Sequence, residues 1–214
     1  MSMIENVFFS GGFDTTSYIL ECLLLKKIKV QPIVVQAKYI DGLSTRRSSE
    51  YHEEVSRKNF YKKFKEKYPK LSNNLLDEIR YENVTLDNDT LNIGKTAFEE
   101  GIFSRTITQD LYFHQTAKDN NLDVVVGYQK DDGFSEKDKL FFKDNLRFRI
   151  PIIDVSKKEL LNTAIKNEYD SFLYETWSCW YPQKNNQPCG ECTLCKITIV
   201  ETKLKFPIVN KELI

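Results

Sequence analysis

A short apolar segment runs directly into two adjacent glycines and then into a long apolar stretch. The segment 6–10 (NVFFS) is rich in strand-forming residues, Gly11 and Gly12 follow it, and 15–26 (TTSYILECLLLK) is apolar around most of a helical circumference. A helix that is apolar on nearly all sides packs between a sheet and other elements rather than against water. A strand, a glycine turn and a buried helix therefore predict the first unit of an α/β fold.

The alternation of strand and helix patterns continues along the chain. Segment 29–37 (KVQPIVVQA) is a second strand with Pro32 near its beginning, and 48–70 is a charged helix with an aromatic residue at about every fourth position. The other expected elements are strands at 81–86, 122–128 and 149–155, a helix at 105–120, and a helix at 156–166 that Ser156 and Glu159 open with a capping box. We expect a doubly wound, mainly parallel sheet whose loops at 39–49 and 131–145 border the ligand site.

The glycine turn carries an unusual density of hydrogen-bond donors for a chain with only eight glycines in 214 residues. Backbone N–H groups at the two glycines, hydroxyl side chains and the positive end of the helix suit a phosphate group. The simpler interpretation is a turn in which Asp14 or Thr15 caps the helix. The loop lacks the G-x-x-x-x-G-K-S/T and G-x-G-x-x-G patterns of other nucleotide sites. The residues concerned are Ser10, Gly11, Gly12, Phe13, Asp14, Thr15 and Thr16.

Four of the five cysteines fall close together as C-x9-C-x2-C-x2-C. Tight C-x-x-C spacing in a reducing compartment favours a metal over a disulfide framework, and four thiolates suit a closed, structural zinc site. Free thiols and an iron–sulfur cluster are the alternatives. We expect one Zn²⁺ bound by Cys179, Cys189, Cys192 and Cys195.

Charge and hydropathy limit the partners of the chain. Lys and Arg total 31, Asp and Glu total 31, and 41% of residues are hydrophobic, which excludes a disordered chain and a strong overall attraction to nucleic acid. No stretch is long and apolar enough for a membrane span, and residues 1–6 lack the basic start of a signal peptide. We expect a cytoplasmic protein without a membrane partner. The segment 46–70 holds nine Lys and Arg against four Glu, and we favour a solvated helix there over a nucleic-acid surface.

The loop S-G-G-F-D-T-T at 10–16 resembles that of the PP-loop ATP pyrophosphatases. The resemblance implies that the loop binds the pyrophosphate end of ATP, which is cleaved between its α and β phosphates to leave an adenylated substrate. Asp14 is then better placed to hold Mg²⁺ than to contact a phosphate of like charge.

The order of motifs is similar to that of the 7-cyano-7-deazaguanine synthases. The motif T-W-S-C stands at 176–179 and P-C-G-E-C-T-L-C at 188–195, and 122–127 (LDVVVG) and 151–154 (PIID) add intermediate landmarks. The resemblance implies an adenine nucleotide alpha hydrolase-like domain at 1–176, a zinc knuckle at 177–200 and a tail at 201–214. It also implies an ATP-dependent C–N ligase of queuosine biosynthesis that converts 7-carboxy-7-deazaguanine to the nitrile with ammonia, and a homodimer.

The same resemblance suggests roles for individual residues. Gly127 joins the loop residues in binding ATP, and the expected catalytic residues are Asp14, Arg105 and Asp132. The family's substrate segments are replaced here by 38–53 and by a lysine-rich stretch after Asp132, so the amine is ammonia or another donor, a protein included. Relatives in antiviral gene clusters suggest a defence role. The alternatives are a non-catalytic zinc-containing nucleic-acid-binding module and a PP-loop transferase that modifies tRNA.

Overall fold

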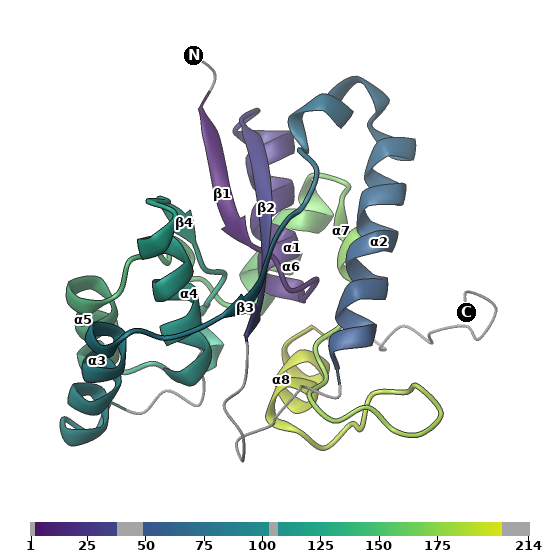
Figure 1. Cartoon of the computed structure of the whole chain (residues 1–214). Coiled ribbons are helices and arrows are strands. Elements are labelled where there is room, and N and C mark those ends of the chain that lie inside the picture. Colours follow the sequence, from purple (N-terminus) through teal and green to yellow (C-terminus); the bar gives the residue numbers. More distant parts are fainter. Residues whose placement is uncertain (1–2, 38–48, 103–106, 203–214) are drawn as a thin grey trace.

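The sheet has four parallel strands in the order β3-β2-β1-β4. The computed structural model describes residues 3–37, 49–102 and 107–202 (Figure 1). The strands are β1 (Ile4–Phe8), β2 (Lys29–Ala37), β3 (Ile79–Val84) and β4 (Val124–Val125). The chain moves outward from β1 to β3 and then returns to the other side of β1, so the strand order reverses between β1 and β4. Open α/β sheets bind ligands beyond the carboxyl ends of the strands at such a switch point. The doubly wound parallel sheet is confirmed.

Helices lie on both faces of this sheet (Figure 1). The short 3₁₀ turns are at Pro69–Asn74 and Lys130–Asp132, and a π-helical turn at Glu21–Leu25 extends the first helix. The helices are α1 (Phe13–Leu20), α2 (Glu50–Lys67), α3 (Asn88–Glu99), α4 (Ile107–Asp119), α5 (Glu136–Asn145), α6 (Lys157–Lys166), α7 (Asp170–Leu173) and α8 (Thr193–Thr202).

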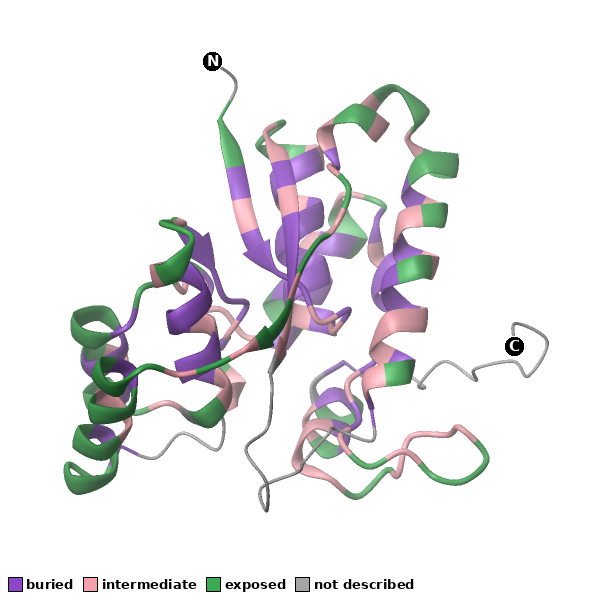
Figure 2. Cartoon of the chain, viewed as in Figure 1, coloured by how far each residue is buried: buried purple, intermediate pink, exposed green. Residues whose placement is uncertain are grey.

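Successive residues of β1 supply two separate hydrophobic cores. Val7 packs with α1, α2, α6 and α7, whereas Phe8 packs with α4 and α5 on the opposite face. Figure 2 shows the buried positions along the central strands and on the inner sides of the helices. Phe60 and Phe64 of α2 are buried in the first core, which confirms that the aromatic residues of this charged helix face inward.

Two expected elements after β4 are wrong. Of the strand expected at 149–155, only Arg149 pairs with the sheet, opposite Val125. Pro151 has no N–H to donate, and the chain turns so that the N–H of Val155 bonds to the carbonyl of Ile152 at 3.0 Å. The loop expected at 131–145 instead contains α5, which begins with a capping box between Ser135 and Asp138.

Other elements also differ from those expected from the sequence. The expected strand at 122–128 is reduced to the two residues of β4, and α3 is a helix that the sequence pattern did not indicate. The strand at 29–37 and the capping box that opens α6 are confirmed. Most of the expected loop at 39–49 lies outside the described residues.

Candidate functional site

The glycine loop leaves the carboxyl end of β1 and turns directly into α1. Gly11 has a φ of +83°, which favours glycine, and Gly12 is the N-cap residue of α1 without a capping side chain. The first N–H groups of a helix have no partner within the helix. The loop therefore presents backbone donors and the positive end of α1 at the switch point, as an anion site requires.

Two glycines allow the backbone to approach this loop closely. A Cβ on Gly11 would lie 2.8 Å from the carbonyl oxygen of Glu53, and a Cβ on Gly127 would lie 2.7 Å from Oγ1 and 3.0 Å from Cα of Thr15. Gly127 follows β4, so the fold brings this residue against the loop across the switch point. Glycine is therefore required at both positions by the packing of the protein itself, whether or not a ligand is bound.

A charged cluster lies beside the loop. The ammonium of Lys157 forms an ion pair with Asp14, at 2.6 Å from Oδ2, although the Lys157 side chain is only 1% exposed and that of Asp14 is 19% exposed. Asp132 follows Asp131, whose carboxylate accepts from the backbone N–H of Lys157 at 2.8 Å. Burial and the negative charge of Asp14 raise the pKa of the Asp132 carboxyl to about 6, while Lys157 opposes the shift. Asp132 therefore belongs to the same charged cluster as Asp14 and Lys157. Arg105, the third expected catalytic residue, lies outside the described residues.

Lys157 is the member of this cluster that sequence reasoning missed. It is the first residue of α6, and its backbone N–H donates to Asp131 at 2.8 Å. A cation at a helix N-terminus opposes the helix dipole. A lysine directly after the capping serine was therefore a signal that this side chain has an anionic partner.

The four cysteines form a second cluster. Their sulfur atoms all lie within 4.8 Å of one another and no disulfide joins them. The Cys189 and Cys195 sulfurs are 3.8 Å apart, and a tetrahedral site with ~2.3 Å metal–sulfur bonds has edges of ~3.8 Å. This donor set fits one thiolate-bound metal ion.

Backbone amides support the thiolate form within this cluster. The N–H groups of Cys189 and Cys192 donate to the sulfurs of Cys179 and Cys189, each at 3.2 Å. Burial opposes ionisation of Cys189, but hydrogen bonds from the amides of Cys192 and Glu191 and from neighbouring thiols together outweigh it and lower its pKa to about 7. Burial raises the pKa of the Cys179 and Cys195 thiols instead. These two thiols would lose their protons as a metal binds.

One tryptophan connects the cysteine cluster to the glycine loop. The Trp177 backbone N–H donates to the Gly11 carbonyl at 3.2 Å, and its indole N–H donates to the Cys179 carbonyl at 2.8 Å. His52 of α2 stacks on the same indole ring, with centroids 4.2 Å apart. Figure 1 places α8 beyond the carboxyl ends of the strands, beside the beginning of α2. The two sequence motifs therefore meet at one end of the sheet.

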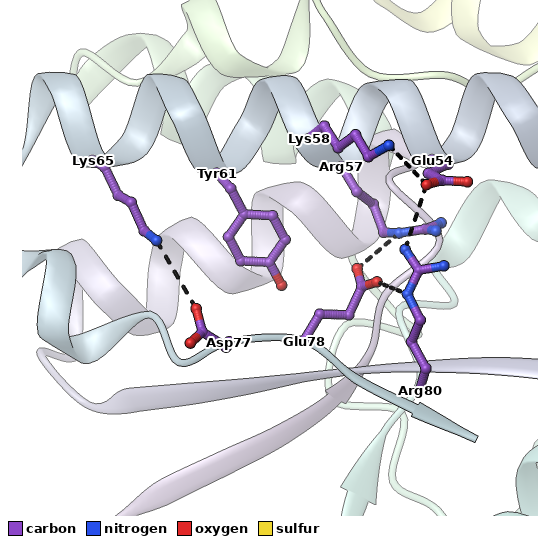
Figure 3. A pocket seen from close by; sticks show the side chains of 8 residues that line it. All are labelled: Glu54, Arg57, Lys58, Tyr61, Lys65, Asp77, Glu78 and Arg80. Carbon is purple, nitrogen blue, oxygen red and sulfur yellow. Dashed lines mark hydrogen bonds and ion pairs between the residues drawn. The ribbon is translucent and has the colours of Figure 1, made fainter. Parts of the chain in front are cut away.

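A pocket of about 210 Å³ lies between α2 and β3 (Figure 3). Its charges are paired with one another: Glu78 accepts from Arg57 at 2.9 Å and from Arg80 at 2.7 Å, and Glu54 pairs with Lys58 at 2.9 Å. We interpret it as a network that fixes α2 on the sheet. The lining residues are Glu54, Arg57, Lys58, Tyr61, Lys65, Asp77, Glu78 and Arg80.

The comparisons with known proteins match parts of the chain. The model of the family described as queuosine biosynthesis protein QueC matches residues 131–199. A segment of 47 residues, 22% of this chain, is 38% identical to the 7-cyano-7-deazaguanine synthase of Prochlorococcus marinus (strain AS9601). That match spans 19% of the length of the relative. The segment that holds Asp132, Lys157 and the four cysteines is therefore similar to QueC, and the match covers less than half of the chain.

Two solved structures resemble the chain over most of its length. A predicted subunit of tRNA methyltransferase from Methanocaldococcus jannaschii has 15% identity and a TM-score of 0.37, with 98% of this chain and 94% of that chain covered. The U34-tRNA thiolase NcsA from Methanococcus maripaludis, solved with its 4Fe–4S cluster, has 12% identity and a TM-score of 0.36, with coverage of 95% and 83%. The doubly wound topology rests on the strand order and not on these two structures.

Among residues 3–37, 49–102 and 107–202, no helix has the length and apolar character needed to cross a bilayer.

Proposed function

We propose that the chain is an ATP-dependent C–N ligase that adenylates the carboxylate of a 7-deazaguanine and transfers the activated acyl group to an amine. One observation carries the proposal. The QueC-like segment 131–199 contacts the glycine loop directly, through the ion pair of Lys157 with Asp14 and the hydrogen bond from Trp177 to Gly11. A segment with the likeness of a 7-deazaguanine enzyme thus completes a loop suited to phosphate.

In this proposal the loop Ser10–Thr16 binds the β and γ phosphates of ATP through its backbone N–H groups, and Gly127 allows Thr15 to lie close. A substrate carboxylate oxygen attacks the α phosphorus, and the bond to the pyrophosphate oxygen breaks. Lys157 supplies a buried positive charge beside the loop where negative charge accumulates. Mg²⁺ held by Asp14 would neutralise charge on the departing pyrophosphate.

The second step forms the C–N bond. The amine nitrogen attacks the acyl carbon, AMP leaves, and the nitrogen loses a proton to give an amide. Asp132 has a pKa raised to about 6 by burial and by the charge of Asp14, so it is ionised at neutral pH and basic enough to accept that proton. The amine is ammonia or a protein amine. Nitrile formation would need a further activation of the amide oxygen.

The remaining parts of the proposal rest on the cysteine geometry and on the sequence. One Zn²⁺ on Cys179, Cys189, Cys192 and Cys195 would have no free coordination position and would hold the C-terminal segment in place. The sequence alone supports Arg105 as a substrate-pocket residue, a homodimer, and division of the chain into 1–176, 177–200 and 201–214.

The test is release of pyrophosphate and AMP from ATP by the purified protein with Mg²⁺ and 7-carboxy-7-deazaguanine, with and without ammonium. Asp14→Asn should abolish release, whereas Asp89→Asn, a change at an exposed aspartate on α3, should not. Absence of both products from the wild-type protein would refute the substrate assignment. Salt-dependent RNA or DNA binding that persists in Asp14→Asn would instead favour the non-catalytic module.

A further inference from the structure

The carbonyl groups of the glycine loop are held by residues outside the loop. The Gly11 carbonyl oxygen accepts from the Ser56 hydroxyl at 2.7 Å and from the Trp177 backbone N–H at 3.2 Å. The Ser10 carbonyl oxygen accepts from the Arg57 guanidinium at 3.4 Å, and Figure 3 shows the same guanidinium group paired with Glu78. Ser56 and Arg57 of α2, together with Trp177, therefore fix the carbonyl groups of Ser10 and Gly11.

The orientation of these carbonyls decides what the loop offers to a ligand. In a trans peptide the C=O and N–H groups point in opposite directions. The peptide between Gly11 and Gly12 directs its C=O toward Ser56 and its N–H toward the Ser10 hydroxyl, at 3.2 Å. Both residues that flank this peptide are glycines without a Cβ, so the peptide can rotate with little steric resistance. In the opposite orientation the carbonyl oxygen would face the Ser10 side of the loop and repel a phosphate.

We propose that Ser56 is a positioning residue of the phosphate loop. It holds the Gly11–Gly12 peptide with its N–H on the Ser10 side of the loop, where a phosphate would take the place of the Ser10 hydroxyl as acceptor. This inference rests on the proposed ATP binding and adds a residue that touches neither substrate nor metal. Ser56 is buried, and its hydroxyl also lies 3.2 Å from the Glu175 carbonyl oxygen. One side chain of α2 thus spans the glycine loop and the segment leading to the cysteine cluster.

Ser56 provides a cleaner test than the other two contacts. Arg57 is also part of the Glu78 network, and Trp177 packs against the cysteine cluster, so changes at either disturb more than the loop. Ser56→Ala removes one hydroxyl without adding volume. Ser72→Ala is a matched control, because Ser72 also donates to a backbone carbonyl, that of Pro69 at 2.8 Å, in the 3₁₀ turn after α2.

The experiment compares ATP and AMP affinities by calorimetry with Mg²⁺ present. A lost hydrogen bond to an oriented carbonyl should weaken ATP binding by about 3- to 10-fold in Ser56→Ala. AMP, which lacks the β and γ phosphates, should bind with nearly unchanged affinity, and Ser72→Ala should alter neither ligand. The amide ¹⁵N shift of Gly12 should also move in Ser56→Ala. If that variant does not fold, Ser56→Cys keeps the side-chain size with a weaker donor.

The outcomes separate this inference from the proposed function. A wild-type protein that binds ATP no better than AMP would refute the phosphate loop itself. A wild-type preference for ATP that Ser56→Ala retains would refute only the role of Ser56. Equal losses for ATP and AMP with a lower melting temperature would show that Ser56 is structural and would also overturn the inference.

Discussion

Replacing Lys157 by methionine tests the charged cluster beside the glycine loop. Methionine keeps the length and the apolar part of the side chain next to Phe13, but it removes the ammonium that pairs with Asp14. Two acidic side chains, Asp14 and Asp132, are then left without their buried cation. Removal of one partner from a buried ion pair costs about 3–5 kcal/mol. Asp14 keeps 19% of its side chain exposed, so we expect a loss of unfolding free energy near the lower end, about 3 kcal/mol at pH 7.5.

The loss should depend on pH with a defined sign. Burial and Asp14 raise the pKa of Asp132 to about 6, so the folded state binds this proton more tightly than the unfolded chain. The favourable contribution of Asp132 is complete below its unfolded pKa near 4 and is lost as the pH rises through 6. Removal of Lys157, which opposes this shift, raises that pKa further. The destabilisation should therefore be small at pH 4.5 and largest above pH 7.

Urea unfolding at pH 4.5 and 7.5 measures both effects, and Lys158→Met, the exposed neighbour on α6, is the matched control. The double variant Lys157→Met with Asp14→Asn should regain much of the loss, and Mg²⁺ should stabilise Lys157→Met more than the wild type. A loss below about 1 kcal/mol at pH 7.5, the range of an exposed pair, would refute a buried pair. An equal loss at both pH values would refute the role given to Asp132.

Two further predictions concern the metal and the glycine contact. Protein purified without chelator should contain one zinc per chain by elemental analysis. Cys192→Ser should lower both the zinc content and the melting temperature, because metal binding and local folding are coupled. Full zinc content and full stability in that variant would contradict the assignment. Gly127→Ala places a Cβ 2.7 Å from Thr15 Oγ1 and should cost about 1–3 kcal/mol and weaken ATP binding. Gly101→Ala adds a Cβ with nothing within 4 Å; the φ of +65° at Gly101 should lower stability through backbone strain, but ATP binding should not change.

Sequence periodicity and spacing predicted the elements whose residues carry strong local signals. The strand at 29–37 is continuously apolar at its centre, and the capping box at Ser156 has its partner Glu159 three residues later. The tight spacing of the four cysteines predicted that their sulfur atoms lie together, as they do. The place of Gly127 beside the loop was implied by the family resemblance, and the fold agrees, because parallel strands end at one edge of the sheet.

Elements held by tertiary contacts were missed. Helix α3 contains Gly94, which lowers its helix propensity, and it buries Thr90 and Ala97 while Phe98 is exposed. Gly94 lets this helix pack closely on α4, where a Cβ would meet Leu111 at 2.8 Å, and a single sequence does not reveal that contact. The capping box of Ser135 and Asp138 signals the start of α5, but the stretch was expected to be a loop because it follows the end of a predicted strand. The sequence assigned no role to Lys157, because its partner Asp14 lies 143 residues away.

This separation affects how the protein forms during synthesis. The glycine loop emerges early from the ribosome, but Lys157 follows Asp14 by 143 residues and Trp177 comes later still. At about 5–20 residues per second, synthesis takes roughly 7–30 s to proceed from Asp14 to Lys157, the side chain that neutralises its charge. Contacts of such long range also slow folding, because a large chain loop must close before they contribute. Nascent chains that stop before α6 would carry the complete S-G-G-F-D-T-T motif without the cation beside it, so the charge of Asp14 is neutralised only after α6 has been made.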